Sequence, residues 1–295
     1  MANGRGAVLA ETDPLAAESF LAIAALDGAN ANARIYQAAP VALADIEDLF
    51  QQHIESRQVV EWNERDRAVS AREERRLYKL PLQERTLTRP DPELVVQAVV
   101  SGIRSIGLSA LPWTEGLASW RARIALMRRL EPEAGWPDLS DTALLDTMET
   151  WLAPFLSGIS RANDFQRIDL HAALNTLLDW LMKKRLDEQA PTHVTVPSGS
   201  TISIDYSADE PVLAVRLQEM FGLADTPAIA SGKLPLLLHL LSPARRPVQV
   251  TRDLRSFWKN GYPEVKKDLK GRYPKHHWPD DPWTAVPTAR AKPRH

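Results

Sequence analysis

The C-terminal part of this chain is best understood from residues 242–282, which read SPARRPVQVTRDLRSFWKNGYPEVKKDLKGRYPKHHWPDDP. Apolar residues recur at helical steps over 252–260, which predicts a helix that Gly261 ends. A second helix is predicted over 263–270, because a proline suits its first turn and Gly271 follows it. We therefore expect two short helices in a segment that is both basic and aromatic.

Charge is distributed unevenly along the chain. The 295 residues contain 36 Lys and Arg against 38 Asp and Glu, a formal net charge of -2. From residue 242 to the end there are 13 basic and 5 acidic residues, a net charge of +8, which leaves -10 for residues 1–241. A basic segment on an acidic body is typical of electrostatic contact with nucleic acid. The alternative is a segment that folds back onto the acidic part and neutralises it.

Cations and aromatic rings alternate within residues 242–282. Single-strand binding needs this combination, because cations neutralise phosphates and exposed rings stack on bases. The alternative is that the rings fill the core, since Phe257 and Trp258 also fit the buried face of a helix. The predicted nucleic-acid-binding residues are Arg245, Arg246, Arg252, Arg255, Trp258, Lys259, Lys266, Lys267, Lys270, Arg272, Tyr273, Lys275, His276, His277 and Trp278.

The second predicted helix should carry a basic strip. Lys266, Lys267 and Lys270 follow each other at helical steps and so share one face. Val265 and Leu269 fall on the opposite face. We expect the lysines to lie in solvent above an apolar strip, where contact with phosphates would cost little packing.

Residues 191–241, upstream of this segment, predict a small α/β module. The alternating runs 193–196 and 201–206 flank a Pro-Ser-Gly-Ser turn, which is a hairpin pattern. A third alternating run covers 211–217. Residues 234–241 form an apolar run that fits either a strand or a buried helix.

Residues 90–190 predict a helical middle part. Apolar side chains recur at steps of three and four residues over 95–106, 117–127 and 144–155. The longest helix is predicted over 168–186. Proline-rich breaks separate these helices.

Residues 1–89 predict strands with one helix between them. The helix begins at Pro40, and the strands are expected at 6–10, 20–26, 34–38, 58–62 and 74–82. Three strands, a helix and two strands is the element order of an OB barrel, which binds single-stranded nucleic acid or oligosaccharide. The predicted fold class is therefore α+β, with an N-terminal OB-like β-barrel, a helical middle segment and a C-terminal α/β module with a basic tail.

No catalytic or metal-binding motif is complete. Gly232-Lys233 resembles the end of a phosphate loop, but Pro227 stands where that motif needs glycine and Leu234 where it needs Ser or Thr. His276 and His277 are adjacent, point apart and have no third ligand nearby. The absence of cysteine excludes disulfides, thiolate nucleophiles and Cys-ligated zinc. We predict no catalytic residue, no metal site and no cofactor in this chain.

Residues 236–282 resemble the C-terminal domain of the HrpB family, bacterial ATP-dependent helicases of the DEAH type. The matching pieces are LLSPARRPVQVTRDLRSFW and YPEVKKDLKGRYPKHHWPDDP, of which RYPKHHWP is the most specific. The pieces VPSGSTISIDYS, PVLAVRLQEMFGL and ANGRGAVL also resemble that family in the same order, so the resemblance spans essentially the whole chain. In such helicases an OB-like barrel and a helical segment follow two ATPase lobes, and the resemblance implies that ATP and magnesium belong to those lobes.

The resemblance implies part of a helicase, because the phosphate loop, the DExH box and the arginine motif of the ATPase lobes have no counterpart in this sequence. We expect a C-terminal piece of a longer helicase or a truncated reading frame. The expected domains are an OB-like barrel at 1–89, a helical domain at 90–190 and the HrpB-type domain at 191–282. A disordered basic tail is expected at 283–295.

The predicted function is that of an accessory, nucleic-acid-contacting portion of an HrpB-like RNA helicase that is no ATPase on its own. The alternative is a protein-interaction module that docks a partner protein or the motor lobes. Single-stranded RNA or DNA is the predicted partner. We expect a cytoplasmic protein without a membrane segment, because no window of the sequence reaches the length of a membrane span.

Overall fold

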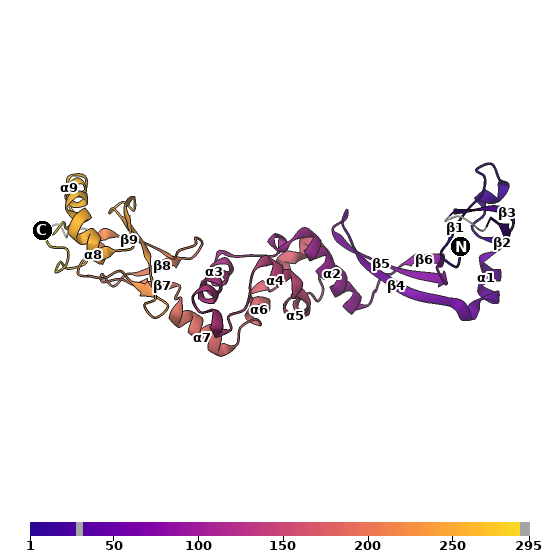
Figure 1. The fold of residues 1–295 in the computed structure, drawn as a ribbon, viewed down its shortest axis with the longest axis horizontal. Coiled ribbons are helices and arrows are strands. Elements are labelled where there is room, and N and C mark those ends of the chain that lie inside the picture. The colour runs from indigo at the N-terminus through magenta and orange to yellow at the C-terminus, as the bar shows by residue number, and fades with distance from the viewer. Residues whose placement is uncertain (28–31, 290–295) are drawn as a thin grey trace. The chain divides into compact units, whose positions relative to one another are not determined.

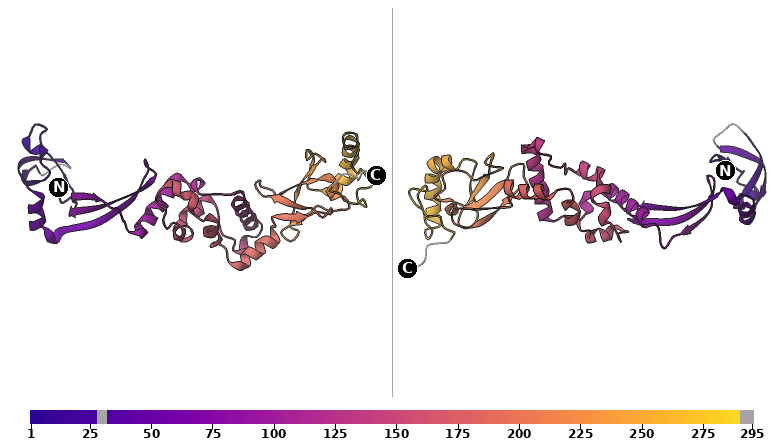
Figure 2. Two further views of the ribbon diagram at one scale, coloured as in Figure 1. Left: turned by 180° about the vertical axis from the view of Figure 1, so that it is seen from behind. Right: turned by 90° about the horizontal axis from the view of Figure 1, so that it is seen from below.

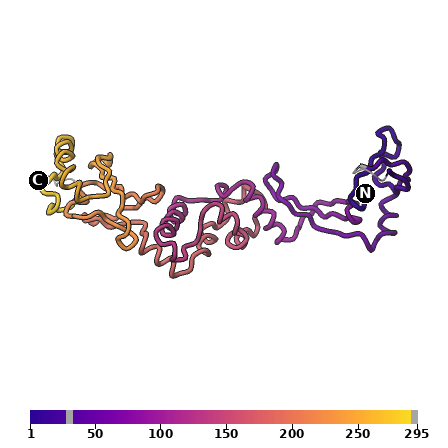
Figure 3. The backbone as a smooth tube through the Cα atoms, in the orientation of Figure 1, coloured from indigo at the N-terminus to yellow at the C-terminus, as the bar shows by residue number. Residues whose placement is uncertain are grey.

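The computed structural model describes residues 1–27 and 32–289, and its backbone is traced in Figures 1 and 3. Its contacts group the chain into two compact units, Met1–Leu111 with Leu152–Ile168, and Pro112–Trp151 with Asp169–His295. Residues 290–295 of the predicted tail lie outside the described part. No helix among the described residues is long and apolar enough to cross a membrane.

The first unit begins with a three-stranded sheet. β3 lies in its centre, pairs in parallel with β1 and pairs antiparallel with β2. A helix, α1, follows, and its Ile46 packs with Leu77 and Leu82 in a small core. The bounds are β1 (Gly6–Val8), β2 (Leu21–Leu26), β3 (Asn32–Pro40) and α1 (Leu43–Leu49), with short 3-10 turns η1 (Pro14–Ala17) and η2 (Gln51–His53).

A second three-stranded sheet follows, in the order β4-β5-β6, and both of its pairings are antiparallel. Its strands are β4 (Ile54–Asn63), β5 (Ala68–Leu77) and β6 (Leu80–Thr86), as Figure 2 shows from two sides. The prediction of one strand over 74–82 is wrong, because the chain turns back at Tyr78 and pairs Leu77 with Leu80. Tyr78 takes a φ of 51°, which a propensity argument does not anticipate.

The predicted OB-like barrel is not confirmed. The described strands form two separate three-stranded sheets, since β3 pairs with β1 and β2 and β5 pairs with β4 and β6. The second sheet is long along its strands, because β4 and β5 pair over ten residues each. What the fold does confirm is the coarser expectation of a mixed α and β protein with several sheets.

Helix α2 (Pro92–Ile106) packs on β4 at a close contact. A Cβ on Gly102 would come within 2.2 Å of the Trp62 ring, so only glycine fits there. The Trp62 ring also stacks on Phe165, with ring centroids 5.9 Å apart. This stacking, together with the bridge between Ala68 and Arg161, explains why 152–168 folds with the first unit. The remaining bounds here are η3 (Leu108–Ala110), η5 (Ala153–Phe155) and η6 (Ala162–Arg167).

The second unit contains the remaining helices. The stripe predicted over 117–127 lies in one helix, α3, but the stripe over 144–155 is divided among two short helices, α4 and α5, and the 3-10 turn η5. The long helix predicted over 168–186 is also wrong: it is divided into α6 and α7, because Asp179 accepts a hydrogen bond from the Met182 N–H (2.7 Å) and so caps a new helix. The bounds are α3 (Glu115–Leu130), η4 (Pro132–Ala134), α4 (Asp141–Asp146), α5 (Met148–Trp151), α6 (Leu170–Asn175) and α7 (Trp180–Gln189).

A five-stranded sheet forms the centre of the C-terminal part, in the order β13-β12-β9-β8-β7. Only β12 and β9 pair in parallel among the pairs of this sheet. The predicted hairpin at 193–206 is confirmed, and Val196 N–H donates to Ser200 O across its turn (3.0 Å). The bounds are β7 (His193–Thr195), β8 (Thr201–Asp205), β9 (Val212–Arg216), η7 (Leu217–Met220), β10 (Ala228–Ile229), β11 (Leu234–Pro235), β12 (Leu237–Leu241) and β13 (Pro247–Thr251).

The two helices predicted at 252–270 are in fact one helical run. It consists of α8 (Leu254–Ser256), the π-turn η8 (Phe257–Gly261) and α9 (Tyr262–Arg272). Gly261 does not end a helix, because Tyr262 N–H donates to Phe257 O and carries the hydrogen bonding across it. Pro263 has no N–H to donate, and a π-turn directly before it accommodates that loss. Gly271 likewise lies inside α9 rather than after it.

Candidate nucleic-acid interface

The large aromatic residues of residues 242–282 are buried except Tyr273, which is partly exposed. Trp258 is 2% exposed and Tyr262 is 1% exposed, and both rings contact Phe221 at centroid distances of 5.8 and 5.9 Å. Trp258 donates its Nε1–H to Leu223 O (2.8 Å), and the Tyr262 hydroxyl donates to Pro279 O (2.9 Å). Burial raises the pKa of the Tyr262 hydroxyl. In this structure these rings hold the core together, so Trp258 is not available to stack on a base.

Residues 273–278 form a turn that is held by contacts among its own residues. Trp278 is buried and donates its Nε1–H to Tyr273 O (2.9 Å), while the Tyr273 ring meets the His276 ring edge to face at 6.2 Å. Burial, with a smaller effect of the Arg216 charge, lowers the pKa of His276. His277 meets the Phe221 ring at 6.3 Å. Among the described residues no group of three His, Cys, Asp or Glu side chains could hold a metal ion.

Four of the predicted cations are neutralised by carboxylates. Lys266 pairs with Asp280 and is only 18% exposed, and the same contact lowers the pKa of Asp280. The four pairs are Arg252–Glu210, Arg255–Asp225 (2.8 Å), Lys266–Asp280 and Arg272–Asp268 (3.0 Å). The first two partners lie on other parts of the C-terminal fold, 42 and 30 residues away along the chain. These four cations therefore form ion pairs within the C-terminal fold.

The other cations are exposed and have no ion-pair partner among the described residues. We call them the open cations: Arg245, Arg246, Lys259, Lys267, Lys270 and Lys275. Lys267 and Lys270 lie on α9 while Leu269 is buried beneath it, as the predicted basic strip requires. Lys266 departs from that strip because of its contact with Asp280.

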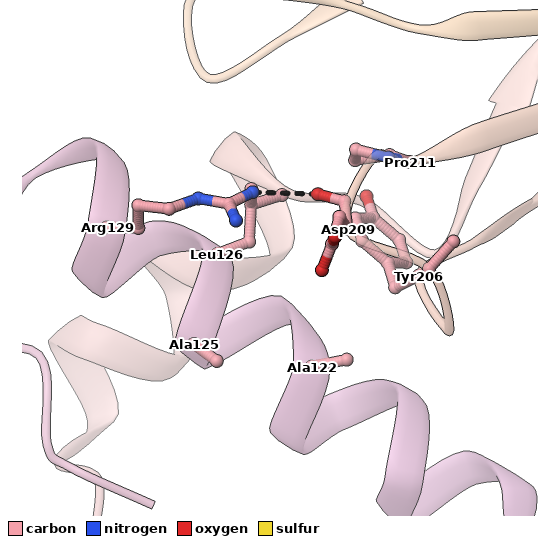
Figure 4. A pocket seen from close by; sticks show the side chains of 8 residues that line it. Ala122, Ala125, Leu126, Arg129, Tyr206, Asp209 and Pro211 are labelled. Atoms are coloured by element: carbon pink, nitrogen blue, oxygen red, sulfur yellow. Dashed lines mark hydrogen bonds between the residues drawn. The ribbon is translucent and has the colours of Figure 1, made fainter. Parts of the chain in front are cut away.

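Sequence reasoning missed an arginine-lined surface on α3. Arg129 donates to Asp209 O (2.8 Å) at a small hollow of about 170 Å³ between α3 and the turn before β9, which Figure 4 shows. Burial raises the pKa of Tyr206, which lines this hollow, to about 12. A larger hollow of about 550 Å³ is lined by Arg121, Arg128 and Arg129. The spacing of these three arginines on one helix was the available sequence signal.

A second charge cluster that the sequence reading missed lies on the β4-β5-β6 sheet. The Glu74 carboxylate, whose side chain is 6% exposed, accepts hydrogen bonds from three arginines. The distances are 2.9 Å from Arg57 Nη2, 3.1 Å from Arg72 Nε and 3.1 Å from Arg76 Nη1. Hydrogen bonding to Arg57 and Arg72 keeps the pKa of Glu74 below its ordinary value, against the effect of burial. We call this group the Glu74 cluster.

Three comparisons with known proteins agree. Residues 151–282 match the family model HrpB_C, the C-terminal domain of ATP-dependent helicases. The chain is 43% identical over 298 residues to the ATP-dependent RNA helicase HrpB of Escherichia coli (strain K12), covering 99% of this chain and 36% of that protein. A crystal structure of the E. coli DExH-box NTPase HrpB matches 99% of the chain and 36% of its own, with 42% identity and a TM-score of 0.69. A second, of the Escherichia coli DEAH/RHA helicase HrpB, matches 94% and 35% with 38% identity and a TM-score of 0.60.

These matches describe a chain that is similar in sequence and in fold to HrpB helicases. The resemblance predicted from the sequence is confirmed: the chain is similar to HrpB over nearly its whole length, and 151–282 carry the C-terminal family sequence. The chain spans 36% of the length of the curated relative. The expected domain boundaries and the predicted binding residues stay predictions.

Proposed function

We propose that this chain acts as the accessory C-terminal portion of an HrpB-like RNA helicase and contacts single-stranded nucleic acid through the open cations. The observation that carries the proposal is that these six exposed cations have no ion-pair partner among the described residues. Each phosphate neutralised on a single strand contributes about -0.7 to the slope of log K against log salt. Contacts by all six would give a slope of about -4.

In this proposal the aromatic residues have a structural role and do not contact the nucleic acid. Trp258 and Tyr262 anchor the helical run that carries Lys259, Lys267 and Lys270. Because their rings are buried, binding by this surface should be electrostatic and tolerant of sequence. Residues that bind only phosphates would not separate RNA from DNA, since that distinction needs contact with the 2′-hydroxyl.

The direct test compares two triple variants that remove the same net charge. Replacing Lys259, Lys267 and Lys270 by Gln should flatten the salt slope for a labelled oligouridylate by about 2. Replacing Arg252, Arg255 and Arg272 by Gln removes three paired cations and should change the slope much less. Fluorescence anisotropy at several salt concentrations measures both. Equal flattening in the two variants would mean that net charge alone matters and would refute a local site.

ATP turnover is proposed to belong to the ATPase lobes of the complete relatives. Neither Gly232-Lys233 nor any other stretch of the sequence supplies the glycines and the Ser or Thr of a phosphate loop. We expect the purified 295-residue chain to neither bind nor hydrolyse ATP, with or without RNA. RNA-stimulated release of phosphate from ATP by this chain would contradict that part of the proposal.

One observation favours the second candidate function, docking of a protein such as the motor lobes. The first unit has an apolar hollow of about 650 Å³, lined by side chains that include Phe20, Ile23 and Phe50. The Phe50 residue is 41% exposed. If the hollow receives a protein, Phe50→Asp should weaken binding to ATPase lobes supplied as a separate protein and leave the salt slope for RNA unchanged. Unchanged binding to the lobes would remove this candidate.

A further inference from the structure

Trp180, the first residue of α7, is exposed in a way that packing does not explain. Its side chain is 74% exposed, and of the nine tryptophans, all of which lie in the described residues, only Trp180 is largely exposed. Exposing a ring of this size forgoes the free energy that burial would provide. Trp180 is also not needed to start α7, because Asp179 already caps that helix.

The surroundings of Trp180 are cationic. Lys184 lies one helical turn further on and places its Nζ 5.9 Å from the centroid of the Trp180 ring. Lys183 precedes it and is partly exposed. The one ion pair of Lys184 among the described residues is a 3.8 Å contact with Glu188, in which both side chains are more than half exposed. Such surface pairs contribute little, so Lys184 can exchange its partner for a phosphate at small cost.

The apolar area around the ring is small. Leu181, 66% exposed, is the next residue, and the partly exposed Met182 follows it. The polar residues Asp179 and Lys183 lie on either side of these three residues in the sequence. A stable protein interface buries roughly 800 Å² on each partner, far more than these three side chains offer. One exposed ring beside cations is instead the arrangement in which a base stacks and its flanking phosphates are neutralised.

We infer that Trp180 is a stacking platform for one nucleobase of a bound single strand, with Lys183 and Lys184 contacting the adjacent phosphates. This inference rests on the proposed function, because it adds a base contact to a surface otherwise proposed to bind phosphates. It also assigns to the first residue of α7 the aromatic role that the sequence reading gave to Trp258 and Trp278.

Three variants of the full chain separate stacking from other roles of this surface. Binding of a labelled oligouridylate should weaken about five- to 150-fold in Trp180→Ala, which corresponds to the loss of one stacked base. Trp180→Phe should retain most of the affinity, because it keeps an aromatic face. Leu181→Ala should bind like the parent chain. The melting temperature of each variant should match that of the parent, because both side chains are exposed.

Inorganic polyphosphate, which has charge and no bases, is the matched probe. Its binding should be unchanged in Trp180→Ala. Equal losses for polyphosphate and oligouridylate would overturn the stacking assignment, as would an unchanged affinity of Trp180→Ala for oligouridylate. A loss in Leu181→Ala as large as that in Trp180→Ala would also overturn it, in favour of an apolar protein contact.

These outcomes are separable from those for the proposed function. If the triple variant of Lys259, Lys267 and Lys270 flattens the salt slope while Trp180→Ala binds normally, the platform is refuted and the electrostatic surface stands. If only Trp180→Ala loses affinity, the platform stands and the open cations are refuted. A parent chain that does not bind oligouridylate at low salt would refute both.

Discussion

The Glu74 cluster and the open cations both contain several positively charged side chains, but only those of the Glu74 cluster are neutralised by a carboxylate. On the β4-β5-β6 sheet, Arg57, Arg72 and Arg76 all donate to one nearly buried carboxylate. On the C-terminal helical run, Lys259, Lys267 and Lys270 extend into solvent without an ion-pair partner among the described residues. A cation that is already hydrogen-bonded to a carboxylate must give up that contact before it can bind a phosphate.

The difference shows that the number of cations in a segment does not measure how many are available to a ligand. Residues 72–76 read REERR, so alternation along one strand places Glu74 between Arg72 and Arg76 on the same face. The register then adds Arg57, which lies directly opposite Glu74 on β4. In the C-terminal segment the acidic residues are too few to neutralise every lysine.

The largest effect is expected from Trp258→Ala, which tests whether the aromatics of the basic segment belong to the core. Removing a buried tryptophan typically costs about 3–5 kcal/mol. Unfolding of the chain by urea, followed by circular dichroism, should show that loss, whereas Trp180→Ala should change stability by no more than about 0.5 kcal/mol. Equal stability of the two variants would place Trp258 at the surface.

Glu74→Gln should convert the neutralised cluster into an open one. With the carboxylate gone, Arg57 and Arg76 lose their carboxylate partner while Arg72 keeps Glu61, so the salt slope for oligouridylate should steepen by up to about 1.4. Glu73→Gln is the control, because Glu73 pairs with a single exposed arginine, Arg85. A slope in Glu74→Gln that equals that of the control would mean that the two regions differ in more than their carboxylates.

The same variant should alter the dependence of stability on pH. The pKa of Glu74 is lowered in the fold by Arg57 and Arg72, so its contribution to stability is present above the ordinary glutamate range. That contribution is lost as the pH falls through the lowered pKa. Thermal unfolding between neutral and acid pH should therefore decline less steeply in Glu74→Gln than in the parent chain. Identical declines would refute the role of this carboxylate.

The smallest effect is expected from Lys266→Gln, which separates a paired cation from its open neighbours on the same helix. Because Lys266 contacts Asp280 and is mostly covered, the salt slope should stay as in the parent chain. Lys267→Gln, one position further on, should flatten it by about 0.7. Anisotropy titrations of the two single variants give the comparison, and a flatter slope in Lys266→Gln would show that the pair opens on binding.

Local signals in the sequence predicted those parts of the fold that depend on neighbouring residues. The Pro-Ser-Gly-Ser turn predicted the hairpin of β7 and β8, and the apolar spacing over 117–127 predicted the helix found as α3. The break between α6 and α7 was missed, because the leucines on both sides continue one helical period and only Asp179 marks the new cap. The strand pairing that leaves two separate sheets depends on contacts between distant segments, which periodicity does not report.

Part of the candidate site could likewise be predicted from the sequence, and part could not. The basic segment itself and the face shared by Lys267 and Lys270 followed from composition and helical spacing. Which cations are paired did not, because Arg252 meets Glu210 and Arg255 meets Asp225 through the tertiary fold. The exposure of Trp180 was hidden for a related reason, since its position in a leucine-rich stretch favours a buried residue.

The π-turn at Phe257–Gly261 determines which face of the following helix reaches the core. An α-helix advances about 100° per residue, so Tyr262 would lie about 80° away from Leu254 on an uninterrupted helix. One extra residue in the π-turn brings Tyr262 back beneath Leu254, where the core is. If the turn closed into regular α-helix without a change of length, everything after it would rotate by about 100°, and Leu269 would leave the core. Removing one of its exposed residues, Lys259 or Asn260, would instead give a continuous α-helix with Tyr262 and Leu269 still on the core side. A single deletion in this turn should therefore be tolerated better than a single insertion.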